Sequence, residues 1–349
     1  MAWDATTQSL KCPYCHHVHE IAAAAGSQDI VEHDLQSGLT MATQRGFGAT
    51  TRTINCKTCG ATVAFGGQSI STRCDFCGSP HVLEQESNRN LIRPESIVPF
   101  GVDQNRAKNM FSEWIGGLWF RPSDLKKRAS VGEINGVYIP YWTFDAWVNS
   151  SWTAQAGHDY QEQEHYWGKD ANGNNVQMTR TVTKTRWQPA WGSRQDHHDD
   201  VLVCAGRGLP EALVQQLHGF ELNQLRPYDP GFLSGWRAEE YAVDLNEAWG
   251  KGLKQIEATQ QQRCHNDVRA DRVQNLNVMN QFGQEKFKHI LLPIWIASYR
   301  YNDKVFRFLI NGQNGQVQGE APYSWVKIFF FSVFVLMVVM LICLLTQGN

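Results

Sequence analysis

The 349-residue sequence has little excess of charge of either sign and no apolar run near its start. Its 32 basic and 34 acidic residues give a formal net charge of −2, so the whole chain has no overall attraction for nucleic acid. The first 20 residues contain three histidines and no apolar run, and a signal peptide is therefore not expected. A mean hydropathy of −0.41 excludes a polytopic membrane protein. The 42% of hydrophobic residues excludes a disordered chain.

Common patterns of catalytic and nucleotide-binding sites are also missing. No Gly-x-x-x-x-Gly-Lys-Ser/Thr loop occurs, and Gly250-Lys251-Gly252 lacks its frame. There is no Gly-x-Ser-x-Gly elbow. The run Asp196–Asp200 has the residue types of a metal site, but five adjacent side chains cannot all face one ion, so we predict a solvated loop. We expect His158 and His165 on the surface, and we expect no enzymatic activity.

Cysteine is abundant and occurs mainly in pairs. Six of the nine cysteines form Cys-x-x-Cys pairs, namely Cys12/Cys15, Cys56/Cys59 and Cys74/Cys77. Since no signal peptide is expected to direct the chain to an oxidising compartment, we predict metal binding by these pairs rather than disulfides. The other three, Cys204, Cys264 and Cys343, stand alone and are expected to be buried or membrane residues.

The second and third pairs have the spacing of a zinc ribbon, with 14 residues between Cys59 and Cys74. Four thiolates fill the tetrahedron of one Zn2+ and leave no position for water, so we predict a structural rather than catalytic ion. Short strands are expected at Thr62–Phe65 and Ser69–Thr72, joined at Gly66-Gly67. Zinc binding of about 10–16 kcal/mol would replace the core that so short a segment cannot build.

The first pair, Cys12 and Cys15, is half of another such site. It could bind a second zinc with help from nearby histidines, among which His19 and His33 are better placed than those directly after Cys15, which are His16 and His17. A second chain could instead donate the missing pair. The alternative interpretation is a remnant knuckle with unliganded, reactive thiols.

The one long apolar run, Ile328–Leu345, contains no charge and a single hydroxyl. Eighteen helical residues extend about 27 Å, which is close to the thickness of the hydrocarbon core. Tyr323, Trp325 and Lys327 precede the run and suit the headgroup region. The alternative is a buried core helix, but such helices are seldom apolar on every face. We predict a single-pass, C-terminal anchor with the N-terminus in the cytoplasm.

The N-terminal 90 residues contain six basic and eight acidic residues. Phosphate binding requires clustered positive charge, which this segment does not provide. We therefore expect the ribbon to bind proteins rather than nucleic acid.

The central region combines helical and strand patterns and is expected to be α+β with an antiparallel sheet. Asp103 can cap a helix that places apolar residues from Ala107 to Ile115 on one face. Residues 147–203 suggest a β-meander. Asp244 and Glu247 form a capping box that opens a helix ending at about His265.

Three further features complete the organisation. Residues 84–94 are polar and suggest a linker. The segments 138–143 and 290–296 are both of the apolar-Pro-x-Trp type and form a weak internal repeat. A hairpin is expected over residues 305–319, with its turn at 311–315. The resulting domains are a truncated zinc-knuckle segment (1–50), the zinc ribbon (51–90), the α+β domain (91–322) and the transmembrane helix (326–346).

Taken together, these residues resemble a bacterial family of membrane-anchored proteins with a transcription-factor-IIB-type zinc ribbon, whose members are often labelled primosomal or helicase-like. The segments that carry the resemblance run along nearly the whole chain and are residues 10–15, 56–77, 97–100, 136–146, 227–235 and 291–295 with the Asn311-Gly312 hairpin.

The resemblance implies zinc-dependent folding and attachment to the inner membrane. Some relatives occur beside phage-shock and flotillin-like (SPFH) proteins and recruit them to the membrane. Relatives tend to have two complete ribbons, whereas this sequence begins at what looks like the middle of the first. The helicase label has no support in the residues, because no nucleotide-binding loop is present.

Two functions of different classes follow. The first is a non-enzymatic scaffold or adaptor at the inner membrane that binds cytoplasmic or membrane-associated proteins and is compatible with homo-oligomers. The second is a DNA-binding or replication-associated zinc protein. The acidic balance of the ribbon favours the first.

Overall fold

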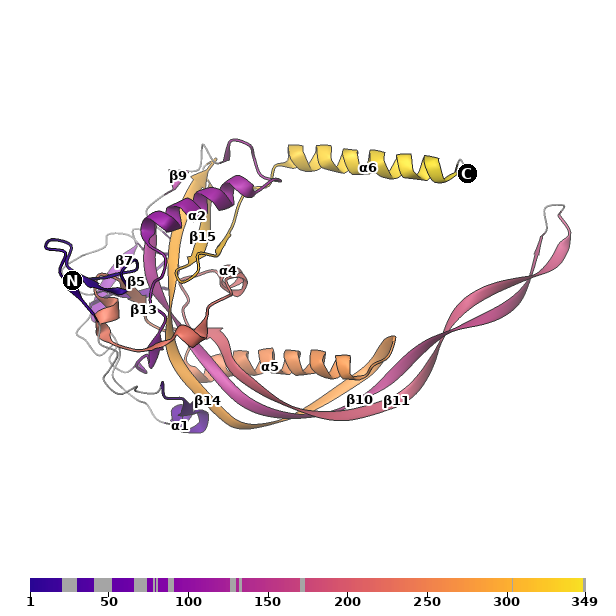
Figure 1. The fold of residues 1–349 in the computed structure, drawn as a ribbon, viewed down its shortest axis with the longest axis horizontal. Helices are drawn as coiled ribbons and strands as arrows, with labels where there is room; N and C mark the ends of the chain where they lie inside the picture. Colours follow the sequence, from indigo (N-terminus) through magenta and orange to yellow (C-terminus); the bar gives the residue numbers. More distant parts are fainter. Residues whose placement is uncertain are drawn as a thin grey trace.

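The fold is α+β, as predicted (Figure 1). The computed structural model describes residues 1–20, 30–40, 52–65, 74–77, 79, 81–86, 91–125, 130–131, 134–169, 173–302 and 304–347. Strands from distant parts of this chain form one mixed sheet, and a C-terminal helix leaves it at one edge of the body.

Helices are interspersed among the strands along the chain. The first strands are β1 (Ala2–Asp4), β2 (Ser9–Lys11), β3 (Val18–His19), β4 (His33–Asp34), β5 (Arg52–Cys56), β6 (Thr62–Phe65), β7 (Val82–Glu86), β8 (Ser96–Ile97) and β9 (Ser130–Val131). The later strands are β10 (Asn135–Lys169), β11 (Asn175–Cys204), β12 (Arg226–Pro227), β13 (Arg237–Glu239), β14 (Arg272–Tyr301), β15 (Lys304–Asn311) and β16 (Val317–Gly319). The helices are α1 (Leu35–Thr40), α2 (Gln104–Gly117), α4 (Glu211–Gln216), α5 (Leu245–Asp267), α6 (Trp325–Gln347) and the short 3-10 turns η1 (Leu222–Gln224) and η2 (Pro230–Leu233).

Strands β10 and β14 form the centre of the large sheet. They are antiparallel, with Tyr138 opposite Pro293 and Pro140 opposite Leu291. The two apolar-Pro-x-Trp segments are therefore partners in one sheet. Their side chains are buried on both faces, and this explains why both segments are apolar without alternation.

The core contains several tryptophans whose indole N–H groups are satisfied. Trp142 donates to the carbonyl of Val243 and Trp295 to that of Val102, both at 2.9 Å. Such partners allow a large amphipathic ring to be buried without an unpaired donor. The tryptophan-rich composition is thus partly explained by the core.

The two longest predicted helices of the body are confirmed. Asp103 caps α2 by accepting from the backbone of Arg106 at 2.9 Å, and Asp244 caps α5 by accepting from Glu247 at 2.8 Å. Helix α5 extends two residues beyond the expected end at His265. It packs along β10, β11 and β14.

The predicted meander over 147–203 is wrong, because β10 and β11 form one long hairpin. They pair antiparallel from Tyr141 opposite Cys204 to Lys169 opposite Asn175. Strand β14 joins them only as far as Gly157, which lies opposite Arg272. Beyond it, the residues that we call the distal ribbon, 159–169 and 175–185, project from the body as two strands (Figure 1).

Two smaller predictions are also wrong. Residues 196–200 lie in β11 rather than in a loop. A run of polar residues is compatible with a strand because successive side chains point to opposite faces of the sheet. The polar segment expected as a linker begins inside β7, which ends at Glu86. The second expected ribbon strand, 69–72, and the Gly66-Gly67 turn lie outside the described residues.

Helix α6 extends away from the body (Figure 1). Its window Trp325–Leu344 is the one stretch among the described residues that is long and apolar enough to cross a membrane. None of this window is buried against the protein, and the buried-helix alternative is therefore excluded for it.

Candidate functional site

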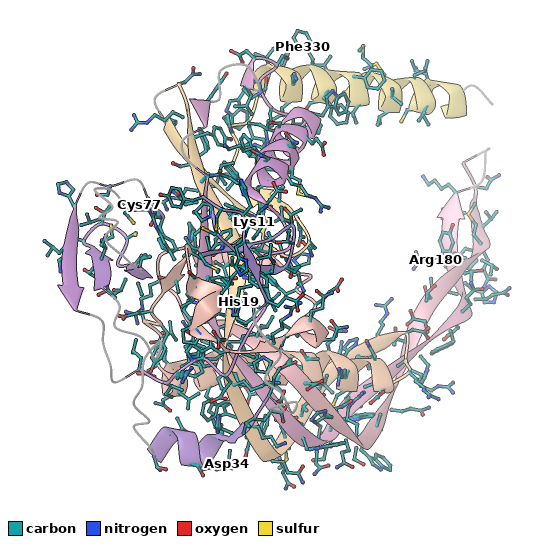
Figure 2. The ribbon with its side chains drawn as sticks, turned by 60° about the vertical axis from the view of Figure 1, so that its left-hand side comes forward. Lys11, His19, Asp34, Cys77, Arg180 and Phe330 are labelled. Carbon is teal, nitrogen blue, oxygen red and sulfur yellow. The ribbon has the colours of Figure 1, made fainter. Side chains whose placement is uncertain are left out.

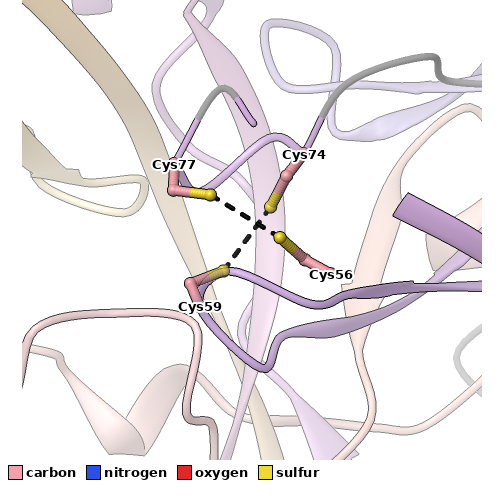
Figure 3. A group of neighbouring side chains, drawn as sticks. All are labelled: Cys56, Cys59, Cys74 and Cys77. Atoms are coloured by element: carbon pink, nitrogen blue, oxygen red, sulfur yellow. Dashed lines mark hydrogen bonds between the residues drawn. The ribbon is translucent and has the colours of Figure 1, made fainter. Parts of the chain in front are cut away.

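Cys56, Cys59, Cys74 and Cys77 converge on one point (Figure 3). The sulfurs of Cys56 and Cys77 are 3.6 Å apart, and so are those of Cys59 and Cys74. Tetrahedral Zn–S bonds of about 2.3 Å require sulfurs about 3.8 Å apart. The donor set and its spacing are therefore compatible with one zinc ion.

Both halves of this cluster are tight knuckles fixed by backbone hydrogen bonds. The amide of Cys56 donates to Ala61 at 2.9 Å, and that of Cys74 donates to Ser79 at 2.8 Å. Gly60 donates back to Cys56 at 2.9 Å and has a φ of +79°, which favours glycine. Each pair of sulfurs is thus placed by the local backbone rather than by flexible side chains.

Backbone amide groups in the first knuckle also change the pKa of the Cys56 thiol. Burial opposes ionisation of Cys56, but the backbone amides of Cys59 and Thr58 point at its sulfur and lower its pKa to about 7. This environment favours a thiolate at Cys56, whereas the Cys59 thiol raises the pKa of Cys74 and burial raises that of Cys77.

The cluster packs against the main sheet. Strand β6 pairs with β13, and Arg237 of β13 forms an ion pair with Asp75 between Cys74 and Cys77. Phe76 is 2% exposed and lies in the same apolar cluster as residues of β10 and β14. A Cβ at Gly208 would come within 2.6 Å of the Phe76 ring. The knuckle therefore fits closely onto the body.

The N-terminal pair has the same knuckle geometry. The amide of Cys12 donates to His17 at 2.9 Å and that of His16 donates to Cys12 at 3.0 Å, matching the bonds around Cys56. His16 occupies the position of Gly60 and likewise has a positive φ of 57°.

The structure does not complete this half-site within the described part of the chain. Cys12 and Cys15 belong to no group there in which three or more potential ligands converge. His33, one of the expected helpers, instead bonds Glu95 at 2.8 Å. Binding of a second zinc by Cys12 and Cys15 stays a prediction.

The base of α6 carries a group of aromatic and basic residues that we call the anchor collar. Its members are Trp119, Phe120, Arg121, Tyr323, Trp325 and Lys327. Lys327 donates to the carbonyl of Trp119 at 3.2 Å, and the guanidinium of Arg121 lies 3.7 Å from the centre of the Tyr323 ring. Trp119 and Phe120 also touch the ring of Phe331 on α6. The loop after α2 thus lies beside the base of α6.

Of the anchor collar, only Tyr323, Trp325 and Lys327 are predicted from the sequence, because they directly precede the apolar run. Trp119 is 69% exposed, and a surface Trp-Phe-Arg triplet was the available signal. Phe76 and the partnership of Asp75 with Arg237 were missed as well, because no local pattern relates residues so far apart.

The distal ribbon is polar and held in register by cross-strand pairs. Lys184 contacts Glu162 at 3.1 Å and Arg180 contacts Glu164 at 2.9 Å. Trp167, near its tip, is 75% exposed. Figure 2 shows Arg180 on the arm that curves away from the body. Such pairs stabilise a ribbon, but its strand edges remain open beyond Gly157 in the described chain.

Comparison with known proteins gives one relative that covers most of both chains. The sequence is 25% identical over 333 residues to YdjG, an uncharacterised protein of Bacillus subtilis (strain 168), a match that spans 78% of this chain and 91% of that protein. No family model matches the sequence. No solved structure matches it either.

Proposed function

We propose that this protein is a membrane-anchored zinc-ribbon adaptor, without enzymatic activity of its own, that recruits protein partners to the inner membrane. The observation that carries the proposal is the combination of an unburied apolar helix with an aromatic and basic collar at its base. Tryptophan, tyrosine and basic residues are enriched at the membrane–water interface. The collar therefore suits the headgroup region on the cytoplasmic side.

The metal has a structural role in this proposal. Four cysteine sulfurs would fill the coordination sphere of Zn2+ and leave no open position for catalysis. Because Phe76 and Arg237 join the knuckle to the sheet, zinc binding would also stabilise the contact between the zinc ribbon and the main sheet.

We assign partner binding to the distal ribbon. A two-stranded hairpin is only marginally stable by itself, and its open edges can accept a further strand. The exposed Trp167 offers the kind of aromatic contact that is enriched in interfaces. The resemblance to membrane-anchored zinc-ribbon proteins suggests SPFH/flotillin-like or phage-shock-type partners.

The test compares three full-length or near full-length chains in bacteria that also produce an SPFH-domain or phage-shock-type protein. The first is the natural chain. In the second, Asn-Gly replaces residues 160–184, which joins the register partners Asp159 and Thr185. The third ends at Val326. Proteins are cross-linked in intact cells, and the membrane and soluble fractions are analysed separately.

We expect the partner in the membrane fraction with the natural chain. The chain without the distal ribbon should stay in the membrane, keep its zinc and lose the partner. The chain that ends at Val326 should hold the partner in the soluble fraction. Salt-sensitive DNA binding by that shortened chain, without any cross-linked protein, would favour a replication-associated zinc protein instead.

A further inference from the structure

A second cluster of potential ligands lies far from the cysteines, where the segment before α1 meets the central strands. Carboxylate oxygens of Glu32, Asp145 and Asp199 lie within 4.8 Å of one another. Glu32 precedes β4, Asp145 lies on β10 and Asp199 on β11. Strand β4 pairs with β14 through His33 opposite Phe287. The three carboxylates thus come from segments that are distant in sequence.

Asp145 is the buried member of this cluster, and only one of its two carboxylate oxygens has a hydrogen-bond partner among the described residues. Its side chain is 3% exposed. One oxygen, Oδ1, accepts from the backbone amide of Asp200 at 2.6 Å. The other, Oδ2, is buried and has no hydrogen-bond partner among the described residues. An unpaired buried carboxylate oxygen is costly, and this one belongs to a residue that faces two further carboxylates.

Two lysines neutralise only part of the charge. Lys286 contacts Glu32 at 2.9 Å, and Lys288 contacts Glu32 at 3.2 Å and Asp200 at 2.8 Å. With Asp145 and Asp199, the group contains four carboxylates and two ammonium groups. Its formal charge is −2 when all are ionised, which matches one divalent cation.

We propose that Glu32, Asp145 and Asp199 bind a hard divalent cation, Mg2+ or Ca2+. Carboxylate oxygens are the ligands that these ions prefer, whereas the softer cysteine cluster favours zinc. Asp145 Oδ2 would gain the partner that it lacks. A register shift between Phe144 and Ala146 leaves Asp145 without a register partner on β11, although it still pairs with Lys286 of β14. Bulges often re-aim a side chain at a functional site.

The cation would fasten residues 30–40 to the sheet. Burial raises the pKa of Asp145 to about 6, so the carboxylate is destabilised without a counter-ion. A bound cation would offset this cost and tie Glu32 to two strands of the central hairpin.

The test is a titration of the zinc-loaded, full-length protein in detergent with Mn2+, which shares the oxygen preference of Mg2+. The electron paramagnetic resonance signal of aqueous Mn2+ gives the free concentration directly. We expect one saturable site per chain that Mg2+ or Ca2+ displaces. Asp145→Asn keeps an acceptor for the Asp200 amide and should weaken binding at least tenfold.

Asp199→Asn alters an exposed side chain, so it should weaken binding to a similar degree without affecting the fold. Glu257→Gln, which removes an exposed carboxylate from α5, is the matched control and should bind as the natural protein does. Absence of a saturable site, or equal binding by Asp199→Asn and Glu257→Gln, would overturn the proposal. The two lysines and water would then account for the cluster.

Discussion

Glu239 of β13 is a buried carboxyl whose ionisation opposes folding. It is 1% exposed, and its Oε1 accepts from the amides of Arg207 and Gly208 at 3.1 and 2.9 Å. Burial outweighs these two bonds and raises its pKa to about 7. In the unfolded chain the pKa returns to about 4.3.

We predict that Glu239→Gln makes the stability less dependent on pH. Between about pH 4.5 and 7 the folded protein keeps a proton on Glu239 that the unfolded chain has lost, so the free energy of unfolding falls as the pH rises through this window. The contribution is on the order of 3 kcal/mol. Urea unfolding at pH 5 and pH 7 should show a smaller difference for Glu239→Gln than for Glu257→Gln, and equal differences would refute the assignment.

The four converging cysteines lead to a prediction about metal content. Elemental analysis of the purified protein should give at least one zinc per chain, and Cys74→Ser should lose it, because three thiolates no longer complete the tetrahedron. Cys343→Ser replaces an exposed cysteine on α6 and serves as the control with unchanged zinc. Full retention of zinc by Cys74→Ser would count against this cluster as the site.

The N-terminal knuckle differs in being open to solvent. Cys15 is exposed, and amides of Cys15 and Tyr14 directed at the sulfur lower the pKa of Cys12. Without a metal, both thiols should react rapidly with a maleimide while Cys56 and Cys74 stay protected. Protection of Cys12 and Cys15 that a chelator removes would instead indicate a second metal, completed by a histidine or by another chain.

At the scale of elements, Phe76 provides a buried aromatic contact between the knuckle and the sheet. Phe76→Ala removes a buried aromatic side chain, for which the typical loss of stability is about 3–5 kcal/mol. The four sulfurs are unchanged, so we expect the zinc content to stay the same and the release of zinc to a chelator to become faster. Phe76→Leu should lie between the two proteins. An unchanged rate of zinc release in Phe76→Ala would show that zinc retention by the zinc ribbon does not depend on this contact.

Local patterns allowed several elements to be predicted. The side chains of Asp103 and Asp244 cap their own helices, so the two starts were readable from a few neighbouring residues. The apolar run of α6 and the pairs of cysteines are equally local. These signals require no knowledge of distant partners.

Long-range pairing could not be predicted in the same way. Nothing near Gly157 in the sequence shows that β14 stops pairing there, and a continuous 35-residue strand exceeds the usual length of about 5–6 residues. The alternating polar pattern of β10 fits a meander and a long hairpin equally well. Likewise, Arg237 contacts Asp75 only because two distant strands meet.

At the scale of the whole molecule, α6 and the distal ribbon extend from the body toward the same side (Figures 1 and 2). The ribbon carries charged pairs such as Lys184 with Glu162, which are costly in hydrocarbon. If α6 spans the bilayer, the anchored protein must tilt α6 or bend the ribbon along the membrane surface. With the N-terminus in the cytoplasm, as we propose, the distal ribbon would lie near the headgroups on that side.

This arrangement predicts the accessibility of the ribbon tip. Gln163→Cys places a thiol on the distal ribbon. A membrane-impermeant maleimide should label this variant more strongly than the natural chain in inside-out vesicles, whereas the two chains should be labelled equally in intact spheroplasts. Labelling of Gln163→Cys from outside would show that the proposed orientation is wrong.

A chain that ends at Val326 should leave the membrane fraction after a high-salt wash, because it lacks the apolar helix. Continued sedimentation of the shortened chain with membranes would show that another segment also anchors the protein.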